Sequence, residues 1–425
     1  MKRLNILIFP CGSEVGLELN RSLKYSRHFK IWGGSSVDDH GKYVFKNYLG
    51  GIPLISDGSF ITHLAEMVQK YSIDAIYPTL DMVSMVLKKS ESELSCKIIG
   101  SSTSTARICL SKNKTYAMLS KLVRTPKKIG LDKKDIQYPV FMKPDVGYGS
   151  RGAKKVYNKE EVLAQLGEYP ESLIIEYLPG DEYTVDCFTD RTGELKFVGP
   201  RIRQRIRMGI SVCTRTIEGN GNSEFAEIAS IINNAISFRG AWFFQLKRDV
   251  NGRLCLLEVA CRIGGSTGIF RAKGVNLALL SVWDAFDIDV EIIENNQIVE
   301  MDRAFDCKYK IDSDYDSIYV DFDDCIIIED KINIELLGFL YHGINIGKRI
   351  ILITKHKNNI NDSLKRYKLL GVFDEVIKIG PMDRKSDFIN SHRSIFIDDS
   401  YSERKEVASA LNIPVFTPDI ASGLM

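Results

Sequence analysis

Two stretches of this 425-residue chain, one at each end, alternate short apolar segments with helical patterns. The apolar segments include LNILIF, FKIWGG and DAIYPTL near the beginning, and IYVDF, RIILIT and SIFID near the end. Strands that alternate with helices are joined by crossovers, and such connections build parallel sheets with helices on both faces. The sequence therefore predicts two doubly wound α/β sheets, with a mixed α+β region between them.

These patterns suggest three domains. An α/β domain is expected over residues 1–105, an α+β domain over 106–310 and a second α/β domain over 317–425. The segment IDSDYD, residues 311–316, is short, acidic and poor in apolar residues, which is typical of a linker.

Composition excludes several classes of protein. The 57 Lys and Arg residues nearly balance the 55 Asp and Glu residues, so no bulk field favours nucleic acid or an anionic membrane. The nine cysteines contain no C-x-x-C pair, which fits reduced thiols better than disulfides or a zinc site. No apolar run approaches the roughly 20 residues that span a bilayer. We expect a cytoplasmic protein that binds neither nucleic acid nor membranes.

Paired carboxylates follow two apolar segments of the last domain. Asp321 and Asp323 come after IYV, and Asp398 and Asp399 come after SIFI. Ligands of parallel sheets bind at the carboxyl ends of the strands, and Mg²⁺ prefers carboxylate oxygens. The pattern predicts a Mg²⁺-dependent phosphoryl-transfer site. The alternative is a pair of ordinary strand-end turns, where Asp is common.

Two further residues complete an ordered set. The segment ILIT ends at Thr354, and an isolated Lys385 follows before the second pair of carboxylates. This order resembles the signature segments of the haloacid dehalogenase superfamily of phosphohydrolases. The resemblance implies that Asp321 attacks phosphorus, that Asp323 protonates the leaving group, and that Thr354 and Lys385 bind the phosphoryl oxygens.

The same resemblance implies a metal site and an open fold. Asp321, Asp398 and the backbone carbonyl of Asp323 would hold Mg²⁺, and Asp399 would support the site. The gaps between the signature segments are too short for a cap domain, so a capless domain is expected. Cys325 stands where members of the superfamily often have Thr.

The segment YPVFMKPDVGYGSRGAKKV is the strongest signal in the central region. A strand ends in Lys143, and a glycine-rich loop follows that contains Gly147, Gly149, Ser150, Arg151 and Gly152. Glycines let backbone N–H groups approach phosphate oxygens. The loop lacks the G-x-x-x-x-G-K-[ST] pattern, so it is no P-loop. A plain glycine-rich hairpin is the alternative.

Three further segments follow in order. Glu176 and Glu182 lie in LIIEYLPGDEYTVDCF, Gln245 and Glu258 lie on two strands of an expected hairpin, and Arg262 follows. Together with the glycine-rich loop they resemble the ATP-grasp superfamily, in its carboxylate–amine ligase and carbamoyl-phosphate-synthase-like branch. The resemblance covers roughly residues 1–305.

The ATP-grasp resemblance implies a nucleotide site. Lys114 and Lys143 would contact ATP, and the loop 147–152 would close over its phosphates. Glu176 would lie at the adenine hinge, and Glu182 would bind the ribose.

It also implies Mg²⁺, or Mn²⁺ in its place, held by Gln245 and Glu258, with Arg262 stabilising the transferred phosphoryl group. Members usually have Glu-x-Asn-x-Arg on this strand, whereas here Ala260 replaces Asn, which puts the second metal position in doubt.

The segment PRIRQRIRMG carries four alternating arginines. A strand would point Arg201, Arg203, Arg205 and Arg207 to one face. A solvated strand face is the alternative. We favour some of them lining the cleft and binding an anionic cosubstrate. His342, His356 and His392 are expected at the surface.

Together, the two resemblances predict a bifunctional enzyme. One half would activate a small-molecule carboxylate as an acyl-phosphate for attack by an amine, and the other would hydrolyse a phosphorylated metabolite. Homo-oligomers are compatible with this hypothesis. Two alternatives stay open: a nucleotide-binding regulatory protein in which Ala260 has abolished ligation, and a phosphatase with a non-ligating grasp module.

Overall fold

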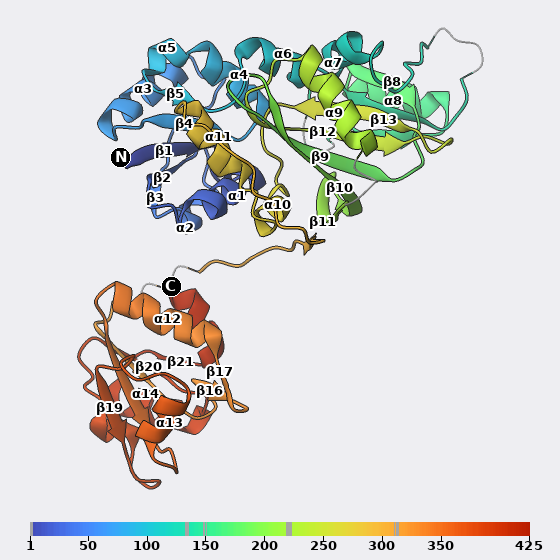
Figure 1. Ribbon diagram of the computed structural model, residues 1–425. Helices are drawn as coiled ribbons and strands as arrows, with labels where there is room; N and C mark the ends of the chain where they lie inside the picture. Colours follow the sequence, from blue (N-terminus) through green and yellow to red (C-terminus); the bar gives the residue numbers. More distant parts are fainter. Residues whose placement is uncertain are drawn as a thin grey trace. The chain divides into compact units, whose positions relative to one another are not determined.

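The computed structural model describes residues 3–131, 136–147, 149, 151–217, 223–309, 311 and 314–425. The chain divides into two compact units, Met1–Phe305 and Asp306–Met425, and each is described by itself (Figure 1). The predicted Ser150 lies outside the described residues. No helix within the described ranges is long and apolar enough to cross a membrane.

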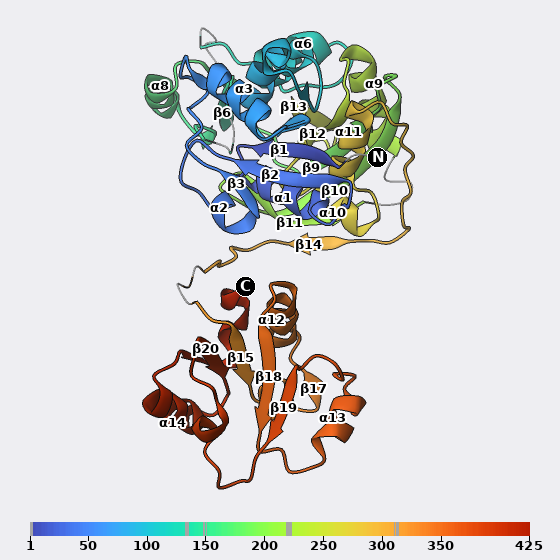
Figure 2. The same ribbon diagram turned by 90° about the vertical axis from the view of Figure 1, so that its left-hand side faces the viewer.

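The first unit begins with a parallel five-stranded sheet of order β3-β2-β1-β4-β5, of which β1, β2 and β3 are labelled in Figure 2 and all five strands in Figure 1. Its strands are β1 (Leu4–Phe9), β2 (Phe29–Gly34), β3 (Asn47–Leu49), β4 (Ala75–Pro78) and β5 (Lys97–Ile98). The helices between them are α1 (Glu14–Leu23), α2 (Gly41–Val44), α3 (Phe60–Lys70), α4 (Asp81–Lys89) and α5 (Glu91–Leu94). The predicted strand–helix alternation over the first hundred or so residues is therefore present.

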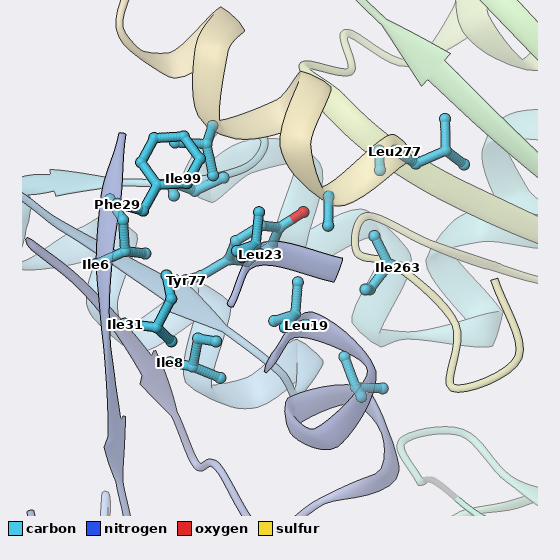
Figure 3. Close-up of a cluster of buried hydrophobic side chains, with 14 of the residues drawn as sticks. Ile6, Ile8, Leu19, Leu23, Phe29, Ile31, Tyr77, Ile99, Ile263 and Leu277 are labelled. Atoms are coloured by element: carbon cyan, nitrogen blue, oxygen red, sulfur yellow. The ribbon is translucent and has the colours of Figure 1, made fainter. Parts of the chain in front are cut away.

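Strand β1 is apolar on both faces because both faces are covered. Ile6 and Ile8 pack with Leu19 and Leu23 of α1, whereas Leu7 and Phe9 pack with α3 and α4 on the other side. The first of these clusters also contains residues from far along the chain, among them Ile263 and Leu277 (Figure 3). The segment that follows the predicted metal strand thus packs on the first sheet.

Two antiparallel sheets make up the rest of the first unit. A three-stranded sheet has the order β7-β6-β8, and a six-stranded sheet has the order β13-β12-β9-β10-β11-β14. The strands of the small sheet are β6 (Val140–Pro144), β7 (Lys154–Val156) and β8 (Ser172–Glu176). Those of the large sheet are β9 (Glu182–Thr189), β10 (Leu195–Arg207), β11 (Ile210–Thr216), β12 (Gly240–Arg248), β13 (Leu254–Ala260) and β14 (Glu300–Asp302). The helices are α6 (Thr103–Leu110), α7 (Lys112–Leu119), α8 (Lys159–Glu168), α9 (Ser223–Ala235), α10 (Gly268–Ala272) and α11 (Leu277–Ala285).

The large sheet has one apolar and one polar face. Val185, Trp242 and Phe244 pack with α6, α7 and α9. Side chains alternate along a strand, so their neighbours Asp186 and Gln245 lie on the opposite face. That polar face is where the central site residues gather.

The second unit is a parallel five-stranded sheet of order β19-β18-β15-β20-β21. Its strands are β15 (Ser317–Val320), β18 (Arg349–Thr354), β19 (Glu375–Lys378), β20 (Ser394–Ile397) and β21 (Val415–Phe416), with a small hairpin of β16 (Ile327–Ile328) and β17 (Lys331–Ile332). The helices are α12 (Ile334–Asn345), α13 (Ile360–Arg366), α14 (Tyr401–Leu411) and two 3₁₀ helices, Lys385–Phe388 and Pro418–Leu424.

One element of this unit differs from the sequence expectation. Residues 383–391, in the stretch expected to alternate strands with helices, form only the single 3₁₀ turn Lys385–Phe388. Lys385 and Ser386 are buried there, and Ser386 Oγ donates to Glu406 of α14. Polar contacts of two buried side chains thus fix this short turn.

Candidate functional site

A cavity of about 220 Å³ in the first unit collects most of the central site residues. It lies among the two antiparallel sheets and the segment after the first sheet, and its walls are Asp81, Cys109, Leu110, Lys112, Phe141, Lys143, Pro144, Gly147, Gly149, Arg151, Ala153, residues 175–178, Glu182, Arg203, Gly209, Gln245, Lys247, residues 257–260 and Arg262. Cations and carboxylates from distant parts of the sequence therefore face one space.

Lys143 is the second-last residue of β6 and is almost fully buried in the wall of this cavity. Its Nζ donates to the backbone oxygen of Leu257 at 2.8 Å and lies 5.5 Å from the centre of the Tyr116 ring. Burial lowers the pKa of Lys143 to about 8, against the attraction of Glu258, because a low-dielectric site disfavours the ammonium form. A lysine held in this way can bind an incoming phosphate oxygen.

The predicted role of Lys114 needs correction. Lys114 is exposed in α7 and is not among the described residues that line the cavity. Lys112, two positions earlier, is 9 % exposed, lines the cavity, and donates from Nζ to the backbone oxygen of Asp145 at 3.2 Å. Ser111 caps the helix by accepting a hydrogen bond from the backbone N–H of Lys114. Within this first turn, the Lys112 side chain lies at the cavity and the Lys114 side chain is exposed.

The glycine-rich loop borders the cavity through Gly147, Gly149 and Arg151. Gly149 has φ +62°, a conformation that glycine adopts without strain. Gly152 does not line the cavity among the described residues; it has φ +69°, and a Cβ there would lie 2.8 Å from Pro144. Gly152 thus shapes the loop.

Glu176, predicted at the adenine hinge, ends β8 and lines the cavity. Its carboxylate accepts from Arg124 Nη1 and from the backbone N–H of Lys127, both at 2.9 Å. Burial raises the pKa of Glu176, but these donors outweigh it, so the pKa lies below its ordinary value. Arg124 also contacts Asp249 at 2.9 Å and so joins the small sheet to the large one. Nothing in the sequence marked Arg124 for this position.

Glu182, Arg203, Gln245 and Lys247 form a polar cluster on the face of the large sheet. Lys247 Nζ lies 3.1 Å from a carboxylate oxygen of Glu182, and Arg203 pairs with the other oxygen. Arg203 Nη1 also donates to Gln245 Oε1 at 3.1 Å. Glu182 therefore lies between two cations in the wall of the cavity.

The predicted metal strand pairs as expected from the hairpin. Gln245 of β12 lies directly opposite Glu258 of β13, and Ala260 follows on the same face. Within the ranges that the structure describes, the first unit holds no group of three His, Cys, Asp or Glu side chains close enough to share a metal ion. Glu258 is thus the carboxylate of the Gln245–Glu258 pair, and the side-chain amide of Gln245 and the methyl group of Ala260 lie beside it.

Arg262 lines the cavity just beyond β13. Its Nε donates to Asp81 Oδ2 at 2.9 Å, and its guanidinium lies 5.4 Å from the centre of the Phe243 ring. Asp81 begins α4 of the first sheet, so Arg262 is oriented by a residue 181 positions away. Asp81 is a second site residue that the sequence did not reveal.

The four arginines of β10 do not share one environment, contrary to the alternation that the sequence suggests. Arg201 is buried and pairs with Asp186 at 2.7 Å, and Arg203 lines the cavity. Arg205 and Arg207 are exposed. The pairing of β10 with β11 shifts register on both sides of Arg205, so the regular alternation of side chains is interrupted there.

In the second unit, Asp321, Lys385 and Asp398 form a buried cluster at the carboxyl ends of β15 and β20. Lys385 Nζ lies 2.9 Å from Asp321 Oδ1 and 2.6 Å from Asp398 Oδ2. Burial raises the pKa of Asp398 to about 6 and, in spite of Lys385 nearby, also raises the pKa of Asp321. Thr354 is fully buried at the end of β18, and its hydroxyl offsets part of the rise in the pKa of Asp321.

Asp321, Asp398 and Asp399 can bring one carboxylate oxygen each to within 4.8 Å of one another, which suits a divalent cation. The side chain of Asp323 is not part of this group among the described residues. It is half exposed, and both of its oxygens lie 2.9 Å from His356 Nδ1. The Nε2 atom of His356 lies 2.9 Å from Ser363 Oγ. His356, predicted at the surface, is therefore mostly buried and orients Asp323.

Part of the first unit matches a known family, and its fold is that of several solved structures. A family model described as "ATP-grasp in the biosynthetic pathway with Ter operon" matches residues 168–309. The comparison with curated proteins finds no match.

Solved structures support the same fold. The biotin carboxylase domain of Hydrogenobacter thermophilus 2-oxoglutarate carboxylase, solved with MgADP, ADP and bicarbonate, aligns at 16 % identity and a TM-score of 0.60, over 71 % of this chain and 74 % of its own. N5-carboxyaminoimidazole synthetase from Staphylococcus aureus, complexed with ADP, aligns at 16 % identity and a TM-score of 0.59. The alignment covers 72 % of this chain and 84 % of the synthetase. L-amino acid ligase from Bacillus licheniformis aligns at 17 % identity and a TM-score of 0.55. The alignment covers 67 % of this chain and 74 % of the ligase.

Proposed function

We propose that the first unit is an ATP-dependent ligase that joins a small-molecule carboxylate to an amine-type nucleophile. The observation that carries the proposal is the convergence of Lys143, Arg262 and Glu258 on one cavity. Structures of similar fold include an amino-acid ligase and enzymes solved with ADP, which supports a nucleotide in this cavity. The pattern of nine free cysteines favours a reducing cytoplasm.

In this proposal ATP binds between the two antiparallel sheets. Lys112 and Lys143 bind phosphate oxygens, the loop around Gly149 covers them, and Glu182 accepts from the ribose. Glu258 would hold Mg²⁺, or Mn²⁺ in its place, together with phosphate oxygens, and the ion would supply positive charge to the phosphates.

Arg262, oriented by Asp81, faces the group in transfer. A substrate carboxylate oxygen forms a bond to the γ-phosphorus while the bond from that phosphorus to the β–γ bridging oxygen breaks, which yields an acyl-phosphate and ADP. The amine then attacks the acyl carbon, and phosphate leaves. Arg262 stabilises the charge that builds on the transferred phosphoryl oxygens.

The test is ADP release by the full chain carrying Asp321→Asn, measured with Mg²⁺ over a panel of carboxylates and amines. Asp321→Asn removes any background hydrolysis by the second unit. ADP that appears only when a particular carboxylate and amine are both present supports the ligase. Tight nucleotide binding without ADP release for any pair would favour the regulatory alternative, in which Ala260 has abolished ligation.

We further propose that the second unit is a Mg²⁺-dependent phosphatase of the haloacid dehalogenase type. The cluster of Asp321, Lys385 and Asp398 at the strand ends carries this proposal. Asp321 attacks the phosphorus of a phosphorylated metabolite as the ester bond breaks, and Asp323 protonates the departing oxygen. Asp323 then takes a proton from the water that hydrolyses the aspartyl-phosphate.

The phosphatase is tested with a panel of phosphate esters and a chelator. Release of phosphate that requires Mg²⁺ and disappears in Asp321→Asn supports it. Hydrolysis that persists in either condition would reject it. If esters are hydrolysed but no carboxylate–amine pair releases ADP, the first unit serves as a module without ligase activity.

A further inference from the structure

Among the residues that the structure describes, the paired strands β12 and β13 do not offer the ligands that two neighbouring divalent ions need. On the paired strands β12 and β13, Glu258 is accompanied by Gln245 and Ala260. Divalent magnesium takes oxygen ligands, and carboxylates are the protein groups that also offset its charge. An amide is neutral and a methyl group has no lone pair. A pair of metal ions side by side therefore does not fit this residue set.

The guanidinium of Arg203 lies against the amide at this position. The Arg203 side chain is 6 % exposed, and its Nη1 donates to Gln245 Oε1 at 3.1 Å and to Glu182. Its Nη2 donates to the backbone oxygen of Gly209 at 2.6 Å. Glu182, Gln245 and Gly209 thus hold the permanently charged guanidinium of Arg203 in the cavity wall.

Part of this guanidinium has no acceptor. Of the five N–H donors of arginine, the one at Nε is buried and has no partner among the residues that the structure describes. Nε and Nη2 lie on one edge of the guanidinium, and this edge matches two oxygens of a phosphate group. Buried donors in native proteins are nearly always satisfied, so an oxygen-rich ligand is the expected partner.

We propose that Arg203 supplies the positive charge that a second divalent ion would otherwise supply, so that a nucleotide triphosphate binds here with one metal ion, held by Glu258. The inference rests on the proposed nucleotide binding by the first unit. Arg203 contacts the terminal phosphoryl oxygens and is carried on a strand adjacent to the one that holds Glu182.

The first experiment counts metal ions. The full chain carrying Asp398→Asn, which weakens the metal site of the second unit, is dialysed against Mn²⁺ with and without a non-hydrolysable ATP analogue. We expect one extra Mn²⁺ per bound nucleotide. The double substitution Gln245→Glu and Ala260→Asn should raise this number to two. Two ions in the chain without the double substitution would overturn the inference, whereas no analogue binding would reject the proposed function itself.

The second experiment separates a phosphate contact from a structural role. In Arg203→Gln, affinity for the ATP analogue should fall at least tenfold, while affinity for AMP changes less than twofold. Arg205→Gln, an exposed neighbour that pairs with Asp302, should alter neither. Equal losses for AMP and the triphosphate would mean that Arg203 only positions Glu182, and would overturn the inference. Arg203→Lys keeps the positive charge but loses the two-pronged guanidinium, so its affinity for the ATP analogue should lie between those of the unsubstituted chain and Arg203→Gln. Thermal melts verify that each variant is folded.

Discussion

Burial of single ionisable side chains governs the expected chemistry at the residue scale. Lys143 is nearly inaccessible, and its pKa of about 8 brings the loss of its proton close to physiological pH. In the second unit, burial likewise shifts a pKa: it raises that of Asp398 to about 6. Neither shift is visible in a sequence, because each depends on which distant segments cover the residue.

Lys143 predicts a pH dependence of nucleotide binding. The ammonium form binds phosphate, so affinity for the ATP analogue should fall as the pH rises above about 8, where Lys143 loses its proton. Lys143→Arg, which stays protonated, should remove most of this decline. Calorimetric titrations between pH 7 and 9.5 or so measure it. A decline of the same size in Lys143→Arg would exclude Lys143 as its source.

Two neighbouring aspartates should respond differently to the same substitution. Asp321→Asn should abolish phosphate-ester hydrolysis, because an amide is a poor nucleophile. Asp324 has φ +55°, a backbone conformation that Asn also tolerates, so Asp324→Asn should retain most of the activity. Steady-state kinetics on one ester compare the two. Equal losses would show that the role assigned to Asp321 is wrong.

His356 predicts an effect on the turnover of the second unit. Without its contact to both oxygens of Asp323, that half-exposed carboxylate would adopt several rotamers. His356→Ala should lower kcat about tenfold with little change in KM, which is less than the 10²–10⁴-fold expected for losing Asp323 itself. Ser363→Ala, which removes only the contact to Nε2, is the milder control. An unchanged kcat in His356→Ala would contradict this role.

At the scale of elements, the sequence indicated most strands and helices but few of the contacts between them. The hairpin that carries Gln245 and Glu258 lies where its pattern places it, and so does the strand that carries Lys143, although this strand ends at Pro144. Lys112 was missed because its side chain is directed by the start of a helix. Arg124 and Asp81 were missed because their partners are more than fifty residues away.

Arg124 predicts a loss of both stability and binding. It bonds to Glu176 of the small sheet and to the nearly buried Asp249 of the large sheet. Arg124→Ala should lower the free energy of unfolding of the first unit by about 2 kcal/mol, less than for a fully buried pair because Arg124 is partly exposed. It should also weaken nucleotide binding. Arg253→Ala, an exposed partner of Asp249, is the control in chemical denaturation. Equal effects of the two substitutions would contradict the joining role of Arg124.

At the scale of the whole molecule, the predicted domain boundaries at residues 105 and 310 remain predictions. The structure divides the chain at residues 305 and 306, close to the expected linker. The first sheet and later elements of the first unit share one hydrophobic cluster, in which Ile6 and Phe29 meet Ile263 and Leu277. Such sharing is invisible in local sequence patterns, because each of these segments reads as an element of its own.

This shared cluster determines how the first unit should unfold on heating. Apolar side chains that complete one another's packing lose their contacts together, so residues 1–105 should have no melting transition of their own. Calorimetry should resolve two unfolding steps, and backbone amides of β1 and α11 should exchange hydrogen for deuterium at the same rate-limiting opening. A fragment beginning after residue 105 would expose Ile263 and Leu277 to water and should aggregate rather than refold.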